Sequence, residues 1–211
     1  MIERRNNPTR RRILKVALKH FAEYGYPGAS IQRIVTDAKI TKPTLYYYFR
    51  SKAGLYQALL DWAYDERHQL MEKATQGNKT FAGQLVAIMT ALFEFLQSNR
   101  PLMRIAFATA FASPGELPPK LKYLEKAARN YEFIHSLINQ ALAAGELSGS
   151  FASEELTMGF FGIMNIYVMA YLVNSKMKLD SSTAERIVQL FLEAPRGQSQ
   201  DSRRGRAGWA A

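Results

Sequence analysis

Residues 30–49, which read SIQRIVTDAKITKPTLYYYF, combine the side chains of this chain that are best suited to chemistry. Ser30 is a good N-cap for a first helix, and a three-residue break precedes a second helix that begins at Lys42. Leu45 and Phe49 are one turn apart on the second helix, so we expect both to face inward. Two helices joined by a tight turn predict a helix-turn-helix unit.

The outward face of the second helix carries a proline, a threonine and tyrosines. With the two apolar residues inside, Pro43, Thr44 and Tyr47 point most directly outward. In a recognition helix such residues reach base edges, while tyrosine and lysine hold phosphates. The alternative is that the tyrosines pack inside the protein, which we expect for one of them, Tyr46 or Tyr48, and not for all three. The residues expected to contact DNA are Ser30, Gln32, Arg33, Thr41, Lys42, Pro43, Thr44, Tyr46, Tyr47, Tyr48 and Lys52.

Positive charge is concentrated at the N-terminal end of the chain. Residues 1–52 carry 12 Lys and Arg against 3 Asp and Glu, whereas residues 53–195 carry 12 against 14. A basic module on a nearly neutral body is typical of a protein that binds nucleic acid. The alternative, a solvated basic face, fits single residues better than the whole cluster. The last residues, 196–211, are polar and rich in glycine, which predicts a disordered tail.

A second candidate site lies in the C-terminal half, where aromatic residues and methionines are frequent. An apolar stripe over 124–142 includes Tyr131 and His135, one turn apart, which would offer polar groups in an otherwise apolar cavity. A histidine on an apolar helix face is more often a hydrogen-bonded core residue, and this alternative stays open. The residues expected to line an effector pocket are Phe93, Phe107, Tyr131, His135, Met164 and Tyr167.

Other classes of site find little support in the sequence. The chain has no cysteine and no pair of histidines or acids at metal spacing, so we expect no disulfide, metal ion or cofactor. It has no glycine-rich phosphate loop and no nucleophile elbow, so we expect no enzyme activity. The alternative of another class is a hydrolase or transferase within a helical bundle. The polar, basic first residues are unlike a secretory leader and favour the cytoplasm.

Helical periodicity runs through the whole chain, and no segment shows the alternation typical of strands. Breaks such as Gly25, Gly77 and Gly145 divide it. A capping box, Ser182-Thr183-Ala184-Glu185, begins the last segment and Pro195 ends it. The predicted helices cover about 9–24, 30–38, 42–50, 51–75, 80–98, 101–111, 119–144, 154–174 and 182–194.

Residues 156–173 contain no charged side chain over 18 positions, a length close to that of a transmembrane helix. Asn165 and two tyrosines argue against a membrane span. A helix that is apolar all round also fits between its own core and a partner subunit. With the helix at 182–194 beside it, we expect a homodimer interface over about 153–194.

The run Thr41–Lys52 (TKPTLYYYFRSK) looks like the recognition helix, and the cap of the fourth helix, of a known family. Phe21–Tyr26 (FAEYGY), with Ser30 and Ile34, matches the elements before it. On these residues the N-terminal quarter of the chain resembles the tetracycline-repressor (TetR/AcrR) family of transcriptional regulators. The resemblance implies a homodimer, a palindromic operator and a divergent C-terminal effector domain.

Two residues depart from the family's pattern. Lys39 stands in the turn where glycine is usual, and a positive φ there would cost a lysine roughly 1 kcal/mol. Gly54 stands where an acidic residue is common early in the fourth helix, so half of a capping box is missing. Neither departure touches Lys42, Thr44 or Tyr47.

We therefore expect an all-α protein with an N-terminal three-helix head, which contains the helix-turn-helix, and a helical C-terminal domain for effector binding and dimerisation. The expected divisions are residues 1–55, 56–195 and 196–211. The expected function is that of a cytoplasmic repressor that binds double-stranded operator DNA and is released by a small hydrophobic or aromatic effector. The alternative is a constitutive DNA-binding regulator without an effector.

Overall fold

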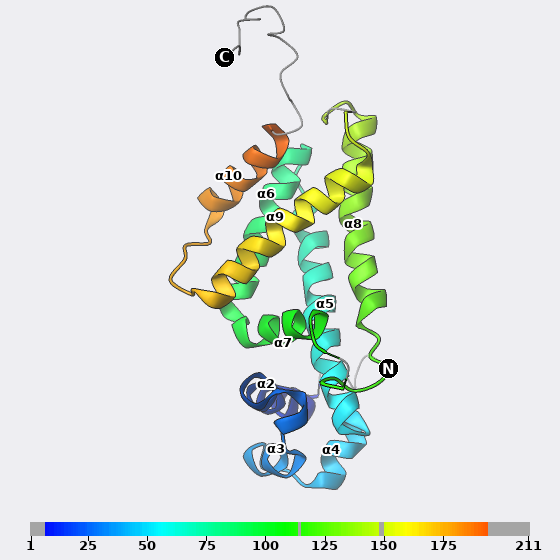
Figure 1. Ribbon diagram of the computed structural model, residues 1–211, viewed down its shortest axis with the longest axis vertical. Coiled ribbons are helices and arrows are strands. Elements are labelled where there is room, and N and C mark those ends of the chain that lie inside the picture. The colour runs from blue at the N-terminus through cyan, green and yellow to red at the C-terminus, as the bar shows by residue number, and fades with distance from the viewer. Residues whose placement is uncertain (1–6, 114, 148–149, 194–211) are drawn as a thin grey trace, which may run out of the picture.

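The computed structural model describes residues 7–113, 115–147 and 150–193, and every regular element in these ranges is a helix (Figure 1). The prediction of an all-helical fold is confirmed. The helices are α2 (Pro8–Gly28), α3 (Ile31–Asp37), α4 (Lys42–Phe49), α5 (Lys52–Thr75), α6 (Phe81–Ser98), α7 (Arg100–Ala110), α8 (Tyr123–Ala143), α9 (Ser153–Val173) and α10 (Ser181–Glu193). The predicted tail, 196–211, lies outside the described residues.

Helices α2, α3 and α4 form a head at one end of the molecule (Figure 1). Asn7, Ser30 and Thr41 cap the three helices, each through a side-chain oxygen that accepts a backbone N–H. Gly25 interrupts α2 with φ 66° and ψ 178°, at the position where the sequence predicts the helix to end. The turn residue Lys39 has φ 50°, so a lysine occupies the left-handed conformation that usually favours glycine.

Helix α5 is the long helix that joins the head to the body (Figure 1). Its cap is Ser51, whose Oγ accepts the backbone N–H of Gly54 at 3.0 Å. A Cβ on Gly54 would lie 2.1 Å from the carbonyl oxygen of Phe49. The missing half of the capping box therefore has a steric reason, because the backbone before α5 passes too close for any side chain at this position.

The described residues form two hydrophobic cores. The head core combines α2, α3 and α4 with the first half of α5, and it also includes Leu102, Ile105 and Ala106 of α7. The body core joins the end of α5 to α6, α8, α9 and α10, and it includes Met103 of α7. Helix α7 lies across the junction (Figure 1), so it contributes to both cores.

Two helix starts in the body differ from the prediction. Helix α8 begins at Tyr123 rather than near residue 119, because a turn precedes it in which Lys120 has φ 64°. Helix α10 is capped by Asp180, whose Oδ1 accepts both the backbone N–H and the hydroxyl of Thr183 at 2.9 Å. The predicted capping box at Ser182 is therefore wrong by two residues. Neither difference changes the order of the elements.

Among the described residues, α6 and α9 are long and apolar enough to cross a membrane by length and composition alone. Helix α6 packs between α5 and α10. Helix α9 packs on α8 and leaves part of its surface uncovered, with Ile166 57% and Val173 86% exposed. The apolar character of α9 thus exceeds what one chain can bury.

Candidate functional site

Helix α4 presents the residues that the sequence predicts to point outward. Leu45 and Phe49 are buried, whereas Tyr47 is 65% and Tyr46 42% exposed. Tyr48 is half-buried against the head core, and its ring centroid lies 5.1 Å from that of Tyr47. One of the three tyrosines therefore packs inward, as the sequence predicts.

The N-terminal end of α4 is open to solvent. Thr41, Lys42 and Pro43 are exposed and Thr44 is half-buried. The hydroxyl oxygens of Thr41 and Thr44 are 2.9 Å apart, so one hydroxyl donates to the other. This contact holds both hydroxyls at the start of the helix, where the end of the helix dipole favours a phosphate.

Helix α3 carries the other predicted DNA contacts of the helix-turn-helix. Ser30 serves as the N-cap, and Gln32 and Arg33 are exposed. The guanidinium carbon of Arg33 lies 5.9 Å from the ring centroid of Tyr24 on α2. Ser30 therefore has a structural role, while Gln32 and Arg33 stay available to a ligand of the head.

Lys52 has partners within the protein. Its Nζ donates to the carbonyl oxygen of Pro27 at 3.0 Å and lies 4.8 Å from the ring centroid of Tyr26. Burial lowers the pKa of Lys52. These contacts tie the start of α5 to the end of α2, a role that the sequence did not indicate.

The basic run at the start of α2 lies beside the recognition helix. Arg10 places its guanidinium carbon 5.2 Å from the ring centroid of Phe49 on α4. Arg11, Arg12 and Lys15 follow on α2 and are exposed. The positive charge of α2 therefore adds to that of α4 on the head, which favours a polyanionic partner.

A partly buried contact that the sequence did not reveal joins α2 to α3. His20 is buried, and its Nε2 lies 2.7 Å from Oδ2 of Asp37. The two residues belong to different helices, so the periodicity of either one could not pair them. The only available signal was a histidine on the buried face of α2.

A cavity of about 550 Å³, which we call the body cavity, lies between α5, α7, α8 and α9. Its lining is mostly apolar. The larger apolar side chains are Met103, Phe107, Phe111, Leu124, Met158, Phe161 and Met169. A pocket of this size and composition suits a small apolar molecule.

The structure brings two of the six predicted effector residues to this cavity, Phe107 and Tyr131. Phe93 and Met164 are buried in the body core, and Tyr167 packs against the same core. His135 has its Nε2 3.0 Å from Oγ of Ser153 at the start of α9. This is the hydrogen-bonded histidine that the sequence left open as an alternative.

Arg67 of α5 lines the body cavity, and the sequence reasoning missed it. Its Nη2 donates to Sδ of Met164 at 3.5 Å, and its guanidinium carbon lies 5.4 Å from the ring centroid of Phe161. Its Nε is buried and has no hydrogen-bond partner. Burial lowers the pKa of Arg67 to about 10, so the guanidinium is still charged at neutral pH.

Two acidic residues, Asp65 and Glu66, directly precede Arg67 on α5, and Asp65 has partners on α8. Its Oδ1 accepts from Nζ of Lys126 at 2.6 Å and from Nη2 of Arg129 at 3.0 Å. Burial raises the pKa of Asp65, but the two cations outweigh burial and the net shift is downward. Asp65 is therefore neutralised from α8 and is not the counter-ion of Arg67.

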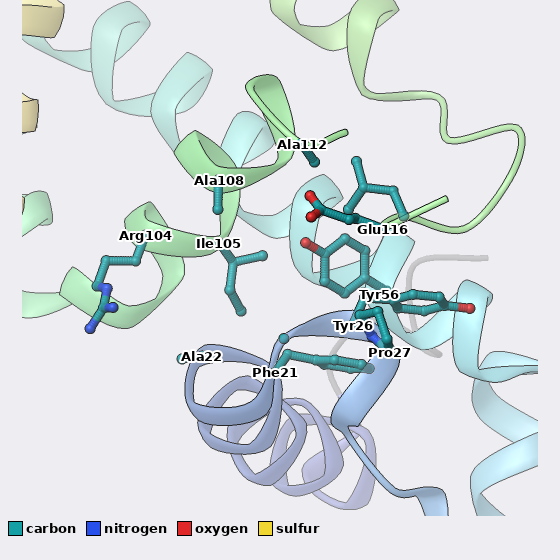
Figure 2. Close-up of a pocket in the computed structure, with 12 residues that line it drawn as sticks. Phe21, Ala22, Tyr26, Pro27, Tyr56, Arg104, Ile105, Ala108, Ala112 and Glu116 are labelled. Carbon is teal, nitrogen blue, oxygen red and sulfur yellow. The ribbon is translucent and has the colours of Figure 1, made fainter. Parts of the chain in front are cut away.

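A smaller cavity of about 340 Å³, the junction cavity, lies between head and body (Figure 2). Figure 2 shows Tyr26 and Tyr56 close to Phe21, and Ile105 of α7 lines the same cavity. The hydroxyl of Tyr56 is 2.9 Å from Oγ1 of Thr109, and burial raises the pKa of Tyr56. Aromatic residues of the head core thus meet α7 at this junction.

In the part of the chain that the structure describes, no group of three His, Asp or Glu residues is placed to hold a metal ion. The chemistry that these residues offer is recognition by charge, hydrogen bonds and apolar contact.

An exposed recognition helix on a basic head, joined to an all-helical body, defines the class of helix-turn-helix DNA-binding regulators. Residues 13–59 match the family described as bacterial regulatory proteins, tetR family. The chain is therefore similar to transcriptional regulators of this family in its head, and the resemblance seen in the sequence is confirmed.

Known proteins extend the similarity over most of the chain. The uncharacterized HTH-type transcriptional regulator YdgC of Bacillus subtilis is 26% identical over 162 residues, which span 72% of this chain and 80% of that protein. The fatty acid degradation regulator FadR from Bacillus halodurans has the same fold, with a TM-score of 0.80 at 18% identity over 92% of this chain and 99% of that one. FadR from Bacillus subtilis, solved in complex with stearoyl-CoA, has a TM-score of 0.71 at 17% identity over 86% of this chain and 97% of that one.

Proposed function

We propose that this regulator is a ligand-responsive repressor that binds a palindromic operator as a homodimer and releases it when a small apolar molecule occupies the body cavity. The observation that carries the proposal is the position of the cavity. Helices α5 and α7 line it, and the same two helices pack in the head core. A ligand in the body cavity therefore contacts the elements that hold the head.

The DNA-binding surface is proposed to be α4 with its neighbours in the head. Lys42, Tyr47 and the arginines of α2 contact phosphates, and Thr44 and Pro43 meet base edges. Two heads of a dimer would reach successive major grooves about 34–36 Å apart, so the operator has two half-sites related by a dyad. Such a complex belongs in the cytoplasm, where the DNA of a bacterium lies.

The dimer interface is proposed to be the uncovered face of α9 together with α10. Ile166 and Val173 are exposed on α9, and Leu190 is 58% exposed on α10. Val188 lies within the predicted interface segment 153–194, but its side chain is buried in the body core. The side chains that remain outside are apolar, which fits a contact between two copies of this chain.

The proposed switch is a change in the position of α5 and α7 relative to the head. A ligand releases DNA only through its differential affinity for the two states. To reverse a 99:1 preference takes about 5.5 kcal/mol of that difference. Apolar burial in a cavity of about 550 Å³ is a plausible source of free energy of this size.

The apolar character of the effector has independent support. The body cavity is lined mainly by aromatic residues, methionines and alanines. FadR from Bacillus subtilis, which shares the fold, was solved with stearoyl-CoA. We therefore place the effector of this chain among molecules with a sizeable apolar part.

The test begins with selection of an operator from random duplexes, because a dimeric reader enriches an inverted repeat. Thermal shift then identifies apolar molecules that bind the protein, and operator affinity is measured with and without each one. Transcription in vitro from a promoter that contains the operator shows whether the bound protein represses. A tight binder of the body cavity that leaves operator affinity unchanged would favour the constitutive regulator instead.

A further inference from the structure

The body cavity holds a charge without a counter-ion. Arg67 is the only charged residue of its lining within the part of the chain that the structure describes. No carboxylate of the described residues lies within 4 Å of its nitrogens, and its interactions are those with Met164, Phe161 and Tyr64. Arg67 is half-buried and its Nε is fully buried, and a cation in such a position is costly to the protein unless something pairs with it.

The edge of the guanidinium formed by Nε and Nη2 is suited to bind an oxyanion. Nε is buried and has no partner, and Nη2 has only a thioether sulfur, a weak acceptor. These two nitrogens form one side of the planar fork, which donates two parallel hydrogen bonds to a carboxylate or a phosphate. The remainder of the lining offers apolar surface, with Met103, Phe107 and Met169 among the larger side chains.

We propose that the ligand of the body cavity is an amphiphilic anion, whose carboxylate or phosphate pairs with Arg67 and whose apolar part lies along the rest of the cavity. This inference rests on the proposed function and specifies its ligand. It assigns Arg67 the role of a specificity-determining residue, which selects a charged amphiphile over a neutral molecule of the same length.

The test uses three probes with one tail: dodecanoate, dodecyl phosphate and dodecan-1-ol. Each is titrated calorimetrically into the protein below the aggregation concentration of the probe. We expect the wild-type protein to bind at least one of the two anions about tenfold or more tightly than the alcohol, because hydrogen bonds between charged groups are worth more than neutral ones. The order of dodecanoate and dodecyl phosphate then shows which oxyanion the site prefers.

Variants of Arg67 assign the preference to this side chain. Arg67→Met should abolish the preference for the anion and retain binding of dodecan-1-ol, whereas Arg67→Lys should retain part of it. Lys73→Met is the matched control, since Lys73 is exposed on the same helix and does not line the cavity. Equal affinity of the wild-type protein for all three probes, or an unchanged preference in Arg67→Met, would overturn the inference.

The two proposals fail in different ways. Binding of an anion that depends on Arg67 but does not alter operator affinity would confirm the ligand class and refute the switch. Release of the operator by a neutral apolar molecule, with no advantage for the anions, would confirm the switch and refute the role of Arg67. If none of the three probes binds, the inference is overturned, while the switch is still tested by the thermal-shift search. The comparison of probes on the wild-type protein needs no variant, so a variant that fails to fold does not block the test.

Discussion

At the scale of single residues, Lys42 and Thr44 are expected to make different contacts with DNA, Lys42 with a phosphate and Thr44 with a base. Lys42→Ala should weaken binding to the operator and to random duplex alike. The salt dependence of the affinity should fall by the amount expected for about one lost phosphate contact. Thr44→Ala should relax the preference at one base pair per half-site, at a cost of about 1–3 kcal/mol. Both effects are measured by fluorescence anisotropy over a range of salt concentrations. Equal losses of both variants on both kinds of DNA would contradict this division.

Arg67 also makes a prediction for the protein without ligand. Arg67→Met should raise the free energy of unfolding by about 1 kcal/mol, because it removes a half-buried charge whose buried Nε lacks a hydrogen-bond partner. Urea denaturation of the wild-type protein and the variant measures the difference, with Lys73→Met as control. A large loss of stability in Arg67→Met would contradict this prediction, because it would show that the contacts with Met164 and Phe161 compensate for the burial of the guanidinium.

The residues of the head were easier to predict than those of the cavity. Tyr47 and Thr44 follow from the spacing of Leu45 and Phe49 on one short helix, so local periodicity places them. The position of Arg67 could not be predicted in this way, because an arginine on a long helix is usually solvated. Only the approach of α8 and α9 encloses this side chain.

At the scale of the elements, the turn between α4 and α5 depends on a residue without a side chain. Gly54→Ala should lower the free energy of unfolding by about 1–3 kcal/mol, because its Cβ would meet the carbonyl oxygen of Phe49 at 2.1 Å. Thermal unfolding measures the loss. Ala53→Gly, at the neighbouring position of α5, is a control for helix propensity alone and should cost no more than about 1 kcal/mol. Similar losses in the two variants would remove the steric explanation.

The contact between α5 and α8 is expected to depend on pH. The folded pKa of Asp65 lies below its ordinary value of 3.8, so its stabilisation is present above that pH. The contribution is lost as the pH falls through the lower, folded pKa. Asp65→Asn should therefore be less stable than the wild-type protein at pH 6, by about 1 kcal/mol, and the gap should close in acid. Asp61→Asn, whose Oδ1 lies 3.5 Å from Nζ of Lys126, should show a smaller gap.

Most helices could be predicted from periodicity, and their ends less well. The ends of α3, α4 and α5 follow from caps that lie within one turn of the helix. The start of α8 does not follow from a cap, since it depends on the left-handed conformation of Lys120. A lysine gives no indication of this conformation in the sequence.

At the scale of the whole molecule, the uncovered face of α9 predicts the oligomeric state. Ile166→Glu and Leu190→Glu should each yield monomers with a retained helical spectrum, because a charge cannot be buried unpaired between two apolar faces. Sedimentation velocity measures the mass, and Gln69→Glu, exposed on α5, is the control. A dimer that survives both substitutions would place the interface elsewhere. Val188→Glu is unsuitable, since it would disrupt the body core.

The architecture of the whole chain was predictable in outline because the DNA-binding head resembles a known family over a continuous stretch. The body cavity was not, because its lining comes from four helices between residues 63 and 169. Contacts over such separations leave no mark in the periodicity of any one helix. The predicted division at residues 55 and 56 stays a prediction.

The place of α7 in the head core has a consequence for how the chain is made. On the ribosome the head emerges first, but its core includes Leu102, Ile105 and Ala106, which follow α4 by some fifty residues of further synthesis. At about 5–20 residues per second, the nascent head waits several seconds for the residues that complete it. The same holds for chimeric regulators. A head transplanted onto another body without the matching face of α7 would arrive with its hydrophobic core open to water.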